Sequence, residues 1–320
     1  VVRGRDLTIV PGGILGYLPF EALLTQAPET AGNYQTHPYL IKAFNISYNY
    51  SAVLLRDKML STTAAPTNDF LGMAPRFDDV VNVQPAGSRT YELGALNYNI
   101  PEVKNIYALM GGTVFLDSLA TEANFRENAG RYNIIHLATH GKANDESSDY
   151  SFLAFYEIKD SIENELLYVK DLYNLYLPAE MVVLSACETG VGELKRGEGI
   201  ISLARGFFYA GVQSIITTLW SIDDRPTAEI MTGFYKNLRR NLPKSDALRQ
   251  AKLEYISGQT GNSKAHPRYW AGFVPVGNMA PVKTIEKSPW AYWLTGGLGL
   301  AILLFFWRKN NRKDATALPE

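Results

Sequence analysis

Two short apolar segments of the sequence each lead into a residue that could take part in nucleophilic catalysis. The first segment, residues 181–184, is followed by Cys187, the single cysteine of the chain. The second segment, residues 132–137, is followed by His140 and Gly141. A thiol becomes a strong nucleophile when a nearby base accepts its proton, and imidazole is the usual base. The pair of Cys187 and His140 therefore predicts a Cys/His hydrolase.

Both segments have the pattern of buried parallel strands. They are short and apolar, and residues 181–184 contain no polar side chain, which is typical of a strand covered on both faces. The carboxyl ends of parallel strands meet at one edge of a sheet, where ligand crevices form in open α/β folds. We therefore expect Cys187 and His140 to lie at the same edge of one sheet.

A structural cysteine is the simplest alternative. A lone buried cysteine is commonly a small hydrophobic residue without a chemical function. Here Ser185, Glu188, Thr189 and Gly190 surround Cys187 with a polar turn, and core packing does not require such a turn. The polar surroundings favour the catalytic interpretation.

A zinc site is a second alternative, because His136 and His140 have the spacing that places two ligands on one face of a helix. Ile134 and Ile135 favour a strand instead. The glutamate of the metalloprotease motif is absent from this segment, and no third ligand is evident. We expect His136 to be a strand residue with a hydrogen-bonding or packing role.

A third apolar strand is expected at residues 214–219, and it leads to two adjacent acids, Asp223 and Asp224. Carboxylates at the same edge as the nucleophile could form the floor of a substrate pocket. A guanidinium group would bind there strongly, because its contact with a carboxylate can be bidentate. Asp224 could instead cap a helix that begins near residues 226–227.

Several motifs, taken in their order, resemble one known domain. They are residues 7–13 with 18–23, 136–141 (His-Leu-Ala-Thr-His-Gly), 184–190 (Leu-Ser-Ala-Cys-Glu-Thr-Gly), 197–199 with 204–211, 219–224 (Leu-Trp-Ser-Ile-Asp-Asp) and 269–277. This set is similar to the CHAT domain, a caspase-like peptidase domain related to separase and often joined to tetratricopeptide repeats. The resemblance covers roughly residues 5–277. Gly12 stands where the family usually has aspartate, a change within a turn that we expect to be harmless.

The resemblance implies a mechanism and a set of site residues. Cys187 would attack the scissile carbonyl as a thiolate, and His140 would protonate the leaving amine and activate the hydrolytic water. The backbone N–H groups of Gly141 and Cys187 would form the oxyanion hole. In separase-like peptidases an acid after the third strand binds the basic residue before the scissile bond, a role that falls to Asp223 or Asp224 here. No metal or organic cofactor is required.

The composition is that of an ordinary globular protein. Hydrophobic residues make up 46% of the chain and charged residues 20%, with a net charge of −1, so a large core is expected. No basic excess indicates binding of nucleic acid through its phosphates, and a single cysteine excludes an intramolecular disulfide framework. The chain begins at Val1 without a signal-like segment, which predicts a fragment of a longer protein. By the resemblance, a regulatory repeat region upstream or a partner protein would control it.

The order of the segments predicts an α/β fold with a caspase-like, mainly parallel sheet and helices on both faces. The expected strands are residues 7–10, 46–55, 70–74, 114–116, 132–137, 181–184, 214–219 and part of 269–277. The expected helices are residues 100–110, 121–128, 169–176, 200–210, 227–238 and 245–256. A hairpin is expected at residues 152–167. The predicted organisation is an N-terminal β-rich segment (1–66), a peptidase core (67–278), a linker (279–289), a transmembrane helix (290–307) and a basic tail (308–320).

Residues 290–307 are predicted to span a membrane as a single helix. The segment has no charged residue, and at a rise of about 1.5 Å per residue it can cross a hydrocarbon core of about 30 Å. Aromatic residues near its ends suit the membrane interface; they are Trp290, Tyr292, Trp293 and Trp307.

The charges that flank this segment predict its orientation. The residues after it include Arg308, Lys309, Arg312 and Lys313, against Lys283 and Lys287 before it. Positive charges remain preferentially on the cytoplasmic side, so we expect a cytoplasmic C-terminus and a periplasmic or extracellular peptidase domain. A cytoplasmic peptidase domain is the alternative.

These features together predict a membrane-anchored cysteine endopeptidase that cuts protein substrates, with a preference for a basic residue before the cut. Two alternatives stay open. A catalytically silent, caspase-like scaffold would act through protein contacts, although both catalytic positions are occupied here. A different Cys/His acyl-transfer enzyme, such as an amidase or a transpeptidase, would turn over small molecules.

Overall fold

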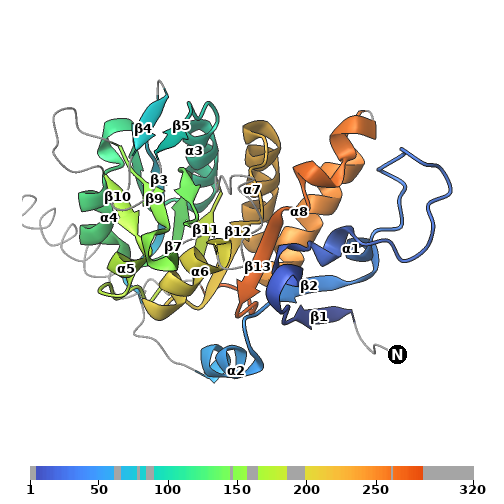
Figure 1. The fold of residues 1–320 in the computed structure, drawn as a ribbon, viewed down its shortest axis with the longest axis horizontal. Helices are drawn as coiled ribbons and strands as arrows, with labels where there is room; N and C mark the ends of the chain where they lie inside the picture. Colours follow the sequence, from blue (N-terminus) through green and yellow to red (C-terminus); the bar gives the residue numbers. More distant parts are fainter. Residues whose placement is uncertain are drawn as a thin grey trace, which may run out of the picture. The chain divides into compact units, whose positions relative to one another are not determined.

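The computed structural model describes residues 5–60, 66–77, 80–83, 90–144, 147–156, 165–185, 199–260 and 262–283. The chain up to Lys283 forms one unit, which is built on an eight-stranded sheet (Figure 1). The strands of this sheet are β1 (Asp6–Ile9), β2 (Asn45–Tyr48), β3 (Asn68–Ala74), β6 (Thr113–Leu116), β7 (Tyr132–Leu137), β11 (Met181–Leu184), β12 (Ser214–Thr218) and β13 (Phe273–Gly277). Their order across the sheet is β1-β2-β13-β12-β11-β7-β3-β6.

The sheet is mainly parallel, as the sequence predicts. Neighbouring strands from β6 through β3, β7 and β11 to β12 are all parallel. β13 is antiparallel to β12, and β2 and β1 run in the direction of β13. The carboxyl ends of β7, β11 and β12 therefore meet at one edge. We call it the carboxyl edge, which the strands reach at Leu137, Leu184 and Thr218.

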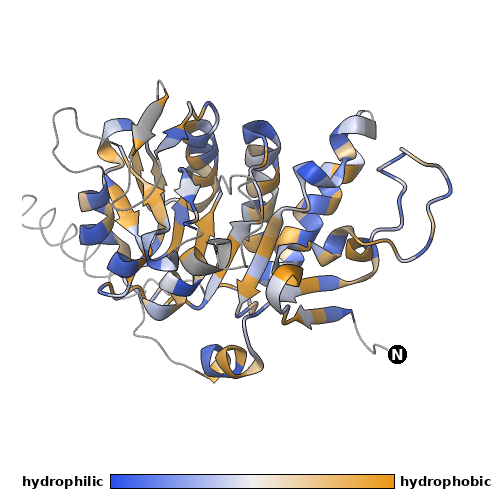
Figure 2. Cartoon of the chain, in the orientation of Figure 1, coloured by the Kyte–Doolittle hydropathy of each residue, from blue (hydrophilic) through white to orange (hydrophobic). Residues whose placement is uncertain are grey.

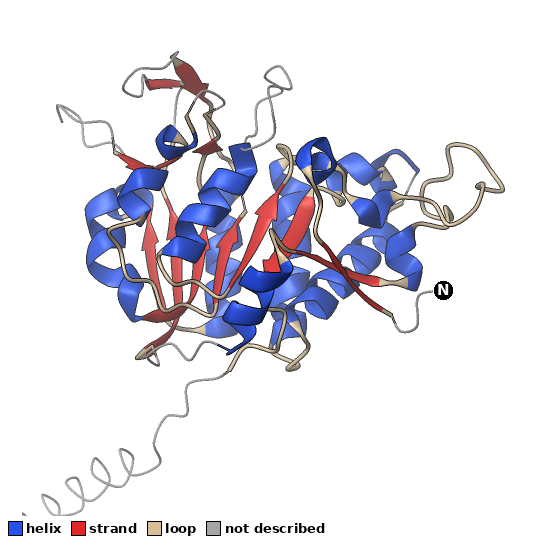
Figure 3. Ribbon diagram, turned by 60° about the horizontal axis from the view of Figure 1, so that its bottom comes forward, coloured by secondary structure: helices blue, strands red, loops and turns tan. Residues whose placement is uncertain are grey.

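Helices cover both faces of the sheet (Figure 3). They are α1 (Leu40–Ala43), α2 (Ala52–Leu60), α3 (Asn99–Met110), α4 (Glu122–Asn128), α5 (Val169–Leu172), α6 (Gly199–Tyr209), α7 (Asp224–Leu238) and α8 (Lys244–Gly258). Alternate residues of a strand point to opposite faces. Ile134 of β7 accordingly shares a buried cluster with residues of α3, α7 and α8, whereas Ile135 shares one with residues of α5 and α6. The predicted α/β layering is confirmed.

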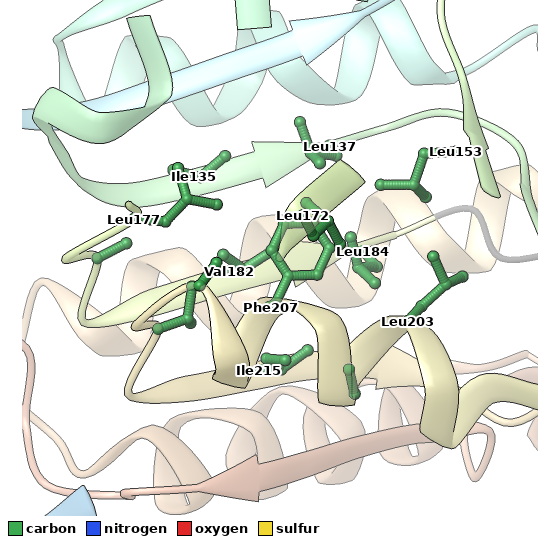
Figure 4. Close-up of a cluster of buried hydrophobic side chains, with 14 of the residues drawn as sticks. Ile135, Leu137, Leu153, Leu172, Leu177, Val182, Leu184, Leu203, Phe207 and Ile215 are labelled. Atoms are coloured by element: carbon green, nitrogen blue, oxygen red, sulfur yellow. The ribbon is translucent and has the colours of Figure 1, made fainter. Parts of the chain in front are cut away.

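The core on the α6 face holds the two strands of interest together. Figure 4 shows Phe207 of α6 and Leu172 of α5 packed against aliphatic residues of three neighbouring strands. Those residues are all buried; they are Ile135, Leu137, Val182, Leu184 and Ile215. Figure 2 shows the same pattern as hydropathy, with hydrophobic strands between helices whose outer surfaces are hydrophilic. Burial of each such side chain stabilises the fold by about 1.5–3 kcal/mol, so this cluster fixes β7 against β11.

Two small sheets accompany the main sheet. One is β8 (Gly141–Lys142), β9 (Phe152–Ala154) and β10 (Leu166–Tyr168), and the other is β4 (Val81–Val83) with β5 (Tyr91–Leu93). β9 and β10 pair antiparallel, which confirms the predicted hairpin. A small core packs the two sheets together; it includes Phe77, Val83, Leu93, Phe152 and Leu166.

The predicted strand at residues 46–55 is wrong in its second half. β2 ends at Tyr48 and α2 begins at Ala52. The hydroxyl of Ser51 accepts a hydrogen bond from the N–H of Leu54 at 3.0 Å, which is the contact that an N-cap residue makes at the start of a helix. Tyr48 therefore ends a short strand, and Tyr50 lies between this strand and α2. The helix expected at residues 121–128 is present as α4, and Thr121 caps it, because its hydroxyl accepts a hydrogen bond from the N–H of Asn124.

The segment before residue 66 contributes β1 and β2 to the main sheet, and a buried polar cluster ties it to α8. Lys252 Nζ donates to Glu21 Oε1 at 3.0 Å and also to the carbonyl of Phe273. The hydroxyl of Tyr48 donates to the other oxygen of Glu21 at 2.6 Å. Burial lowers the pKa of the Lys252 ammonium, and the carboxylate of Glu21 opposes that shift. Each carboxylate oxygen of Glu21 thus has a protein partner.

After β13 the chain runs along the opposite edge of the sheet, at the amino ends of β12, β11 and β7. The N–H of Asn278 donates to the carbonyl of Gln213 at 3.0 Å. The N–H of Lys283 donates to the Glu180 carboxylate at 2.7 Å, and its carbonyl accepts from the Asn133 side chain at 2.8 Å. The start of the predicted linker is therefore bound to the sheet.

Within the described ranges, no helix combines the length and the apolar character that a membrane crossing needs. The predicted span at residues 290–307 and the basic tail at residues 308–320 lie outside those ranges. The membrane anchor stays a prediction from the sequence.

Candidate active site

His140 lies just beyond the carboxyl end of β7, three residues after Leu137. Its side chain is buried, and the ring of Phe77 packs edge-on against it with 4.7 Å between the ring centroids. Its Nε2 atom lies 2.7 Å from the carbonyl oxygen of Gly94. A carbonyl oxygen only accepts, so Nε2 carries the hydrogen and Nδ1 carries the lone pair of the neutral ring. Nδ1 is therefore the nitrogen that can take a proton from a thiol.

The register between β7 and β11 relates His140 to the position of Cys187. Leu184 pairs with Leu137, and the N–H of Ser185 donates to the carbonyl of Leu137 at 3.1 Å. His140 and Cys187 each come three residues after this pair in their own segments. Cys187 lies outside the described residues, so its contact with His140 stays a prediction. β7 and β11 end side by side at the carboxyl edge, as the sequence analysis expects.

Gly141 begins β8, which is the edge strand of its small sheet. The N–H of Ala154 donates to the carbonyl of His140 at 2.9 Å, which makes these two residues a hydrogen-bonded pair of the antiparallel ladder. The next pair, Gly141 with Leu153, is then of the other kind, and its N–H and C=O groups point away from the partner strand. The N–H of Gly141 thus points away from β9, and its part in an oxyanion hole stays a prediction.

His136 has the structural role that the sequence analysis expects. Its Nε2 atom donates to Glu102 Oε1 at 2.9 Å, and its Nδ1 atom lies 3.0 Å from the hydroxyl of Tyr235. All three side chains are at most 2% exposed. Burial raises the pKa of Tyr235 well above its ordinary value, so its hydroxyl keeps its proton. In the described part of the chain, no group of three or more metal-ligating side chains comes together.

Asp223 precedes α7 and is largely exposed. Its side chain is 56% exposed, and Oδ1 lies 3.7 Å from Nη2 of Arg268, which is 61% exposed. An ion pair that is this accessible to water contributes little to stability. The carboxylate of Asp223 can therefore exchange Arg268 for another cation at small cost.

Asp224 is the first residue of α7, and its side chain does not cap the helix. The cap position is occupied by Asp223, whose side chain makes no capping hydrogen bond. The alternative that Asp224 caps a helix beginning near residues 226–227 is therefore wrong. Asp224 Oδ2 instead accepts a hydrogen bond from the backbone N–H of Asn97 at 3.1 Å. This contact joins the start of α7 to the loop that also carries Gly94.

A hollow of about 540 Å³, open to solvent, lies on the α6 face of the sheet over β12, β13 and β2. The side chains around it are uncharged and include those of Tyr17, Tyr48, Leu219 and Val274. Neither predicted substrate-binding acid lines it. Asp223 and Asp224 therefore lie outside this hollow.

The CHAT domain is the protein family whose sequence model matches this chain, over residues 2–278. This chain belongs to the CHAT domain family. The resemblance inferred from the motifs is thus confirmed over most of the sequence.

Curated relatives of this CHAT domain are much longer proteins. Human tetratricopeptide repeat protein 28 is 26% identical over 208 residues, which are 55% of this chain and 8% of that protein. The mouse protein of the same name is 25% identical over 201 residues, which are 53% of this chain and 8% of that protein. The chain therefore spans less than a tenth of the length of these relatives.

Solved structures similar to this CHAT domain include two peptidase systems. The separase–securin complex of Saccharomyces cerevisiae matches with a TM-score of 0.48 and 13% identity, over 82% of this chain and 15% of that chain. The Arg-specific cysteine proteinase gingipain R matches with a TM-score of 0.47 and 11% identity, over 74% of this chain and 55% of that chain.

The structure adds site residues that the sequence analysis of this CHAT domain missed. Gly94 acts through its backbone carbonyl and Asn97 through its N–H, and no side-chain pattern signals either contact. Glu102 and Tyr235 could have been found, because each lies on the apolar face of a helix beside residues with the helical spacing. A buried polar side chain on such a face needs a hydrogen-bond partner. His136, expected on a buried strand, was the residue that could have been proposed as that partner.

Proposed function

We propose that this CHAT domain is a cysteine endopeptidase that hydrolyses peptide bonds in protein substrates through His140 and Cys187. The observation that supports it best is the hydrogen bond from His140 Nε2 to the carbonyl of Gly94. This bond leaves Nδ1 as the basic nitrogen, and His140 follows β7, whose parallel neighbour β11 leads to the only thiol of the chain.

The proposed reaction follows from these positions. His140 Nδ1 takes the proton of the Cys187 thiol, and the thiolate attacks the scissile carbonyl carbon. The C–N bond breaks as the imidazolium returns that proton to the leaving amine, which leaves a thioester on Cys187. Water, deprotonated by His140, then attacks the thioester; the C–S bond breaks, the imidazolium returns the proton to the sulfur of Cys187, and the carboxylic acid is released. The N–H groups of Gly141 and Cys187 stabilise the oxyanion in both halves. No step calls for a metal or a cofactor.

A library of peptides that differ in the residue before the cut tests this function and its preference for basic residues. We expect cleavage after arginine or lysine by the wild-type chain and none by Cys187→Ala. In Asp223→Ala the loss of a charged partner should lower kcat/KM for basic substrates about 10- to 100-fold. Glu229→Ala, which removes another exposed acid from α7, is the matched control and should leave the preference unchanged.

Each other outcome of the library assay has a clear meaning. Cleavage after an uncharged residue would keep the peptidase and reject the role of Asp223. Turnover of small amides without cleavage of peptides would favour the amidase alternative. If no peptide is cut, an electrophilic peptide probe decides, because Cys187 is the only thiol in the chain. Labelling that requires His140 indicates a latent peptidase, and absence of labelling indicates a scaffold.

A catalytically silent scaffold is the second candidate function. The curated relatives are tetratricopeptide repeat proteins of which this domain matches only 8%, so most of each relative consists of other sequence. Control by an upstream repeat region, or by a separate partner protein, belongs to this proposal in either case. A scaffold predicts that partner binding survives in Cys187→Ala and His140→Gln alike.

Membrane anchoring through residues 290–307 is also part of our proposal. The supporting observation is that this segment has no charged residue and has tryptophans near both ends. Tryptophans at these places suit the membrane interface. We expect the full chain to stay in the membrane fraction after alkaline carbonate extraction, and a chain that ends at residue 283 to leave it. In sealed vesicles, protease access to the peptidase domain but not to the basic tail would support the predicted orientation. The reverse pattern would place the domain in the cytoplasm.

A further inference from the structure

We propose that Asp224 is a positioning residue that holds the loop of residues 94–98 against His140, rather than a substrate-binding acid. The proposal rests on the proposed function of His140 and Cys187, and it assigns Asp224 a part in that site. Two contacts carry it. Asp224 Oδ2 accepts the N–H of Asn97 at 3.1 Å, and three residues earlier in the same loop the carbonyl of Gly94 accepts His140 Nε2 at 2.7 Å.

Both ends of this loop are fixed in the fold. Leu93, just before it, is 1% exposed in the small core beside β9 and β10. Asn99, just after it, is buried and donates through Nδ2 to the carbonyls of Pro75 at 2.7 Å and Ala138 at 3.2 Å. These carbonyls lie just beyond the ends of β3 and β7. The loop therefore has anchored ends, and what holds its middle decides where the carbonyl of Gly94 points.

The middle of the loop is less buried than its ends. Gly94 and Leu96 are partly exposed, and Asn97 and Tyr98 are exposed. Leu96 packs against the small core, whereas Asn97 and Tyr98 are exposed, so a hydrogen bond to a rigid element is what fixes the backbone at Asn97. Among the hydrogen bonds of the described residues, the one from α7 to this stretch is the bond between Asp224 and Asn97.

Asp224 itself lies on a helix that is tied to the strand of His140. The hydroxyl of Tyr235 on α7 bonds to His136 of β7, and the other ring nitrogen of His136 bonds to Glu102 on α3. This buried cluster of Glu102, His136 and Tyr235 links the two helices whose first turns flank the loop. This cluster fixes α7 against β7, and α7 carries Asp224 as its first residue, beside the loop.

The two possible roles of Asp224 make different demands on its side chain. A substrate-binding acid needs the negative charge. A group that accepts one backbone N–H needs only an oxygen in the right place, and the side chain of asparagine supplies it. Asp224→Asn and Asp224→Ala therefore separate the roles, and Glu229→Ala on the same helix is the control for loss of an exposed acid.

The test uses the full chain, with kinetics on basic and uncharged peptides and with imidazole ¹⁵N NMR spectra. The chain has four histidines, so the signal of His140 can be assigned from His140→Gln. We expect Asp224→Ala to lower kcat about five- to tenfold on every substrate that the wild type cuts, with KM unchanged, as the loss of one hydrogen bond implies. Its His140 signal should move away from the pure Nε2–H tautomer. Asp224→Asn should restore both the rate and the spectrum.

Two results would overturn the proposal. One is an equal loss in Asp224→Asn and Asp224→Ala that is confined to basic substrates, with an unchanged His140 signal, because this is the behaviour of a substrate-binding acid. The other is an unchanged His140 signal in Asp224→Ala. The spectra need no turnover. A wild type that cuts nothing would count against the peptidase, while a His140 signal that moves in Asp224→Ala and returns in Asp224→Asn would still support the positioning role.

Discussion

Replacement of His140 by glutamine should lower kcat/KM for peptide hydrolysis about 10²–10⁴-fold, the usual contribution of a general acid–base group. Glutamine retains an amide N–H that can donate to the carbonyl of Gly94, as Nε2 of His140 does. It cannot accept a proton from Cys187 or return one to the leaving amine. The change therefore removes the proton transfer and keeps most of the buried packing against Phe77. Steady-state kinetics and the thermal midpoint, measured together, separate the two effects.

The reactivity of Cys187 provides the control for this prediction. Because the chain has one cysteine, the rate of alkylation by iodoacetamide reports that thiol alone. A neighbouring imidazolium stabilises the thiolate and lowers the pKa of the thiol, whereas an isolated cysteine has a pKa of about 8.5. In His140→Gln the pH profile of alkylation should move toward that value. Equal profiles and equal rates in both proteins would contradict a catalytic pair.

The elements that carry His140 and Cys187 could be predicted because the physical signal is local. The apolar run of residues 181–184 has to be buried on both faces, and β11 is the fifth strand in the order of an eight-stranded sheet. The run that leads to His140 has the same character, and β7 is its parallel neighbour. Two buried parallel strands that end in polar residues deliver those residues to the same edge. This geometry follows from pleat and direction alone.

The contacts that orient the catalytic histidine could not be predicted in the same way. The partner of His140 is the backbone carbonyl of Gly94, 46 positions away in sequence, and every residue has such a carbonyl. Asp223 and Asp224 are adjacent in sequence, yet one faces Arg268 and the other a backbone N–H of Asn97. Which of the two lies free to meet a substrate depends on where α7 begins. Helix ends are the least certain part of a pattern-based assignment.

The change of strand direction at β13 also could not be predicted from local sequence patterns. β13 is antiparallel to β12 and is followed across the sheet by β2 and β1, from the other end of the sequence. The apolar alternation of β2 predicts a strand but not its neighbour. Long-range pairing is decided by which surfaces remain to be covered after the helices have packed. Here the buried contact between Glu21 and Lys252 joins the two distant segments.

Replacement of Lys252 by methionine should destabilise the domain by about 3–5 kcal/mol, the effect of removing one partner from a buried ion pair. Methionine fills nearly the same volume, so a cavity is not the cause. The change leaves Glu21, which is 2% exposed, with a charge that faces no cation, and it leaves the carbonyl of Phe273 without its donor. Chemical denaturation with a two-state fit measures the difference in the free energy of unfolding.

A double mutant tests whether the unpaired charge is the cause. Glu21→Gln removes the charge but still offers an oxygen to the hydroxyl of Tyr48, which donates to Glu21 Oε2. We therefore expect Lys252→Met/Glu21→Gln to be more stable than Lys252→Met, although it carries one more substitution. Arg225→Met is the matched control, because its pair with Glu229 is exposed and should contribute only about 0–1 kcal/mol. If the double mutant is instead the least stable of the set, the buried charge does not determine the loss, and the lost hydrogen bond from Lys252 to the carbonyl of Phe273 does.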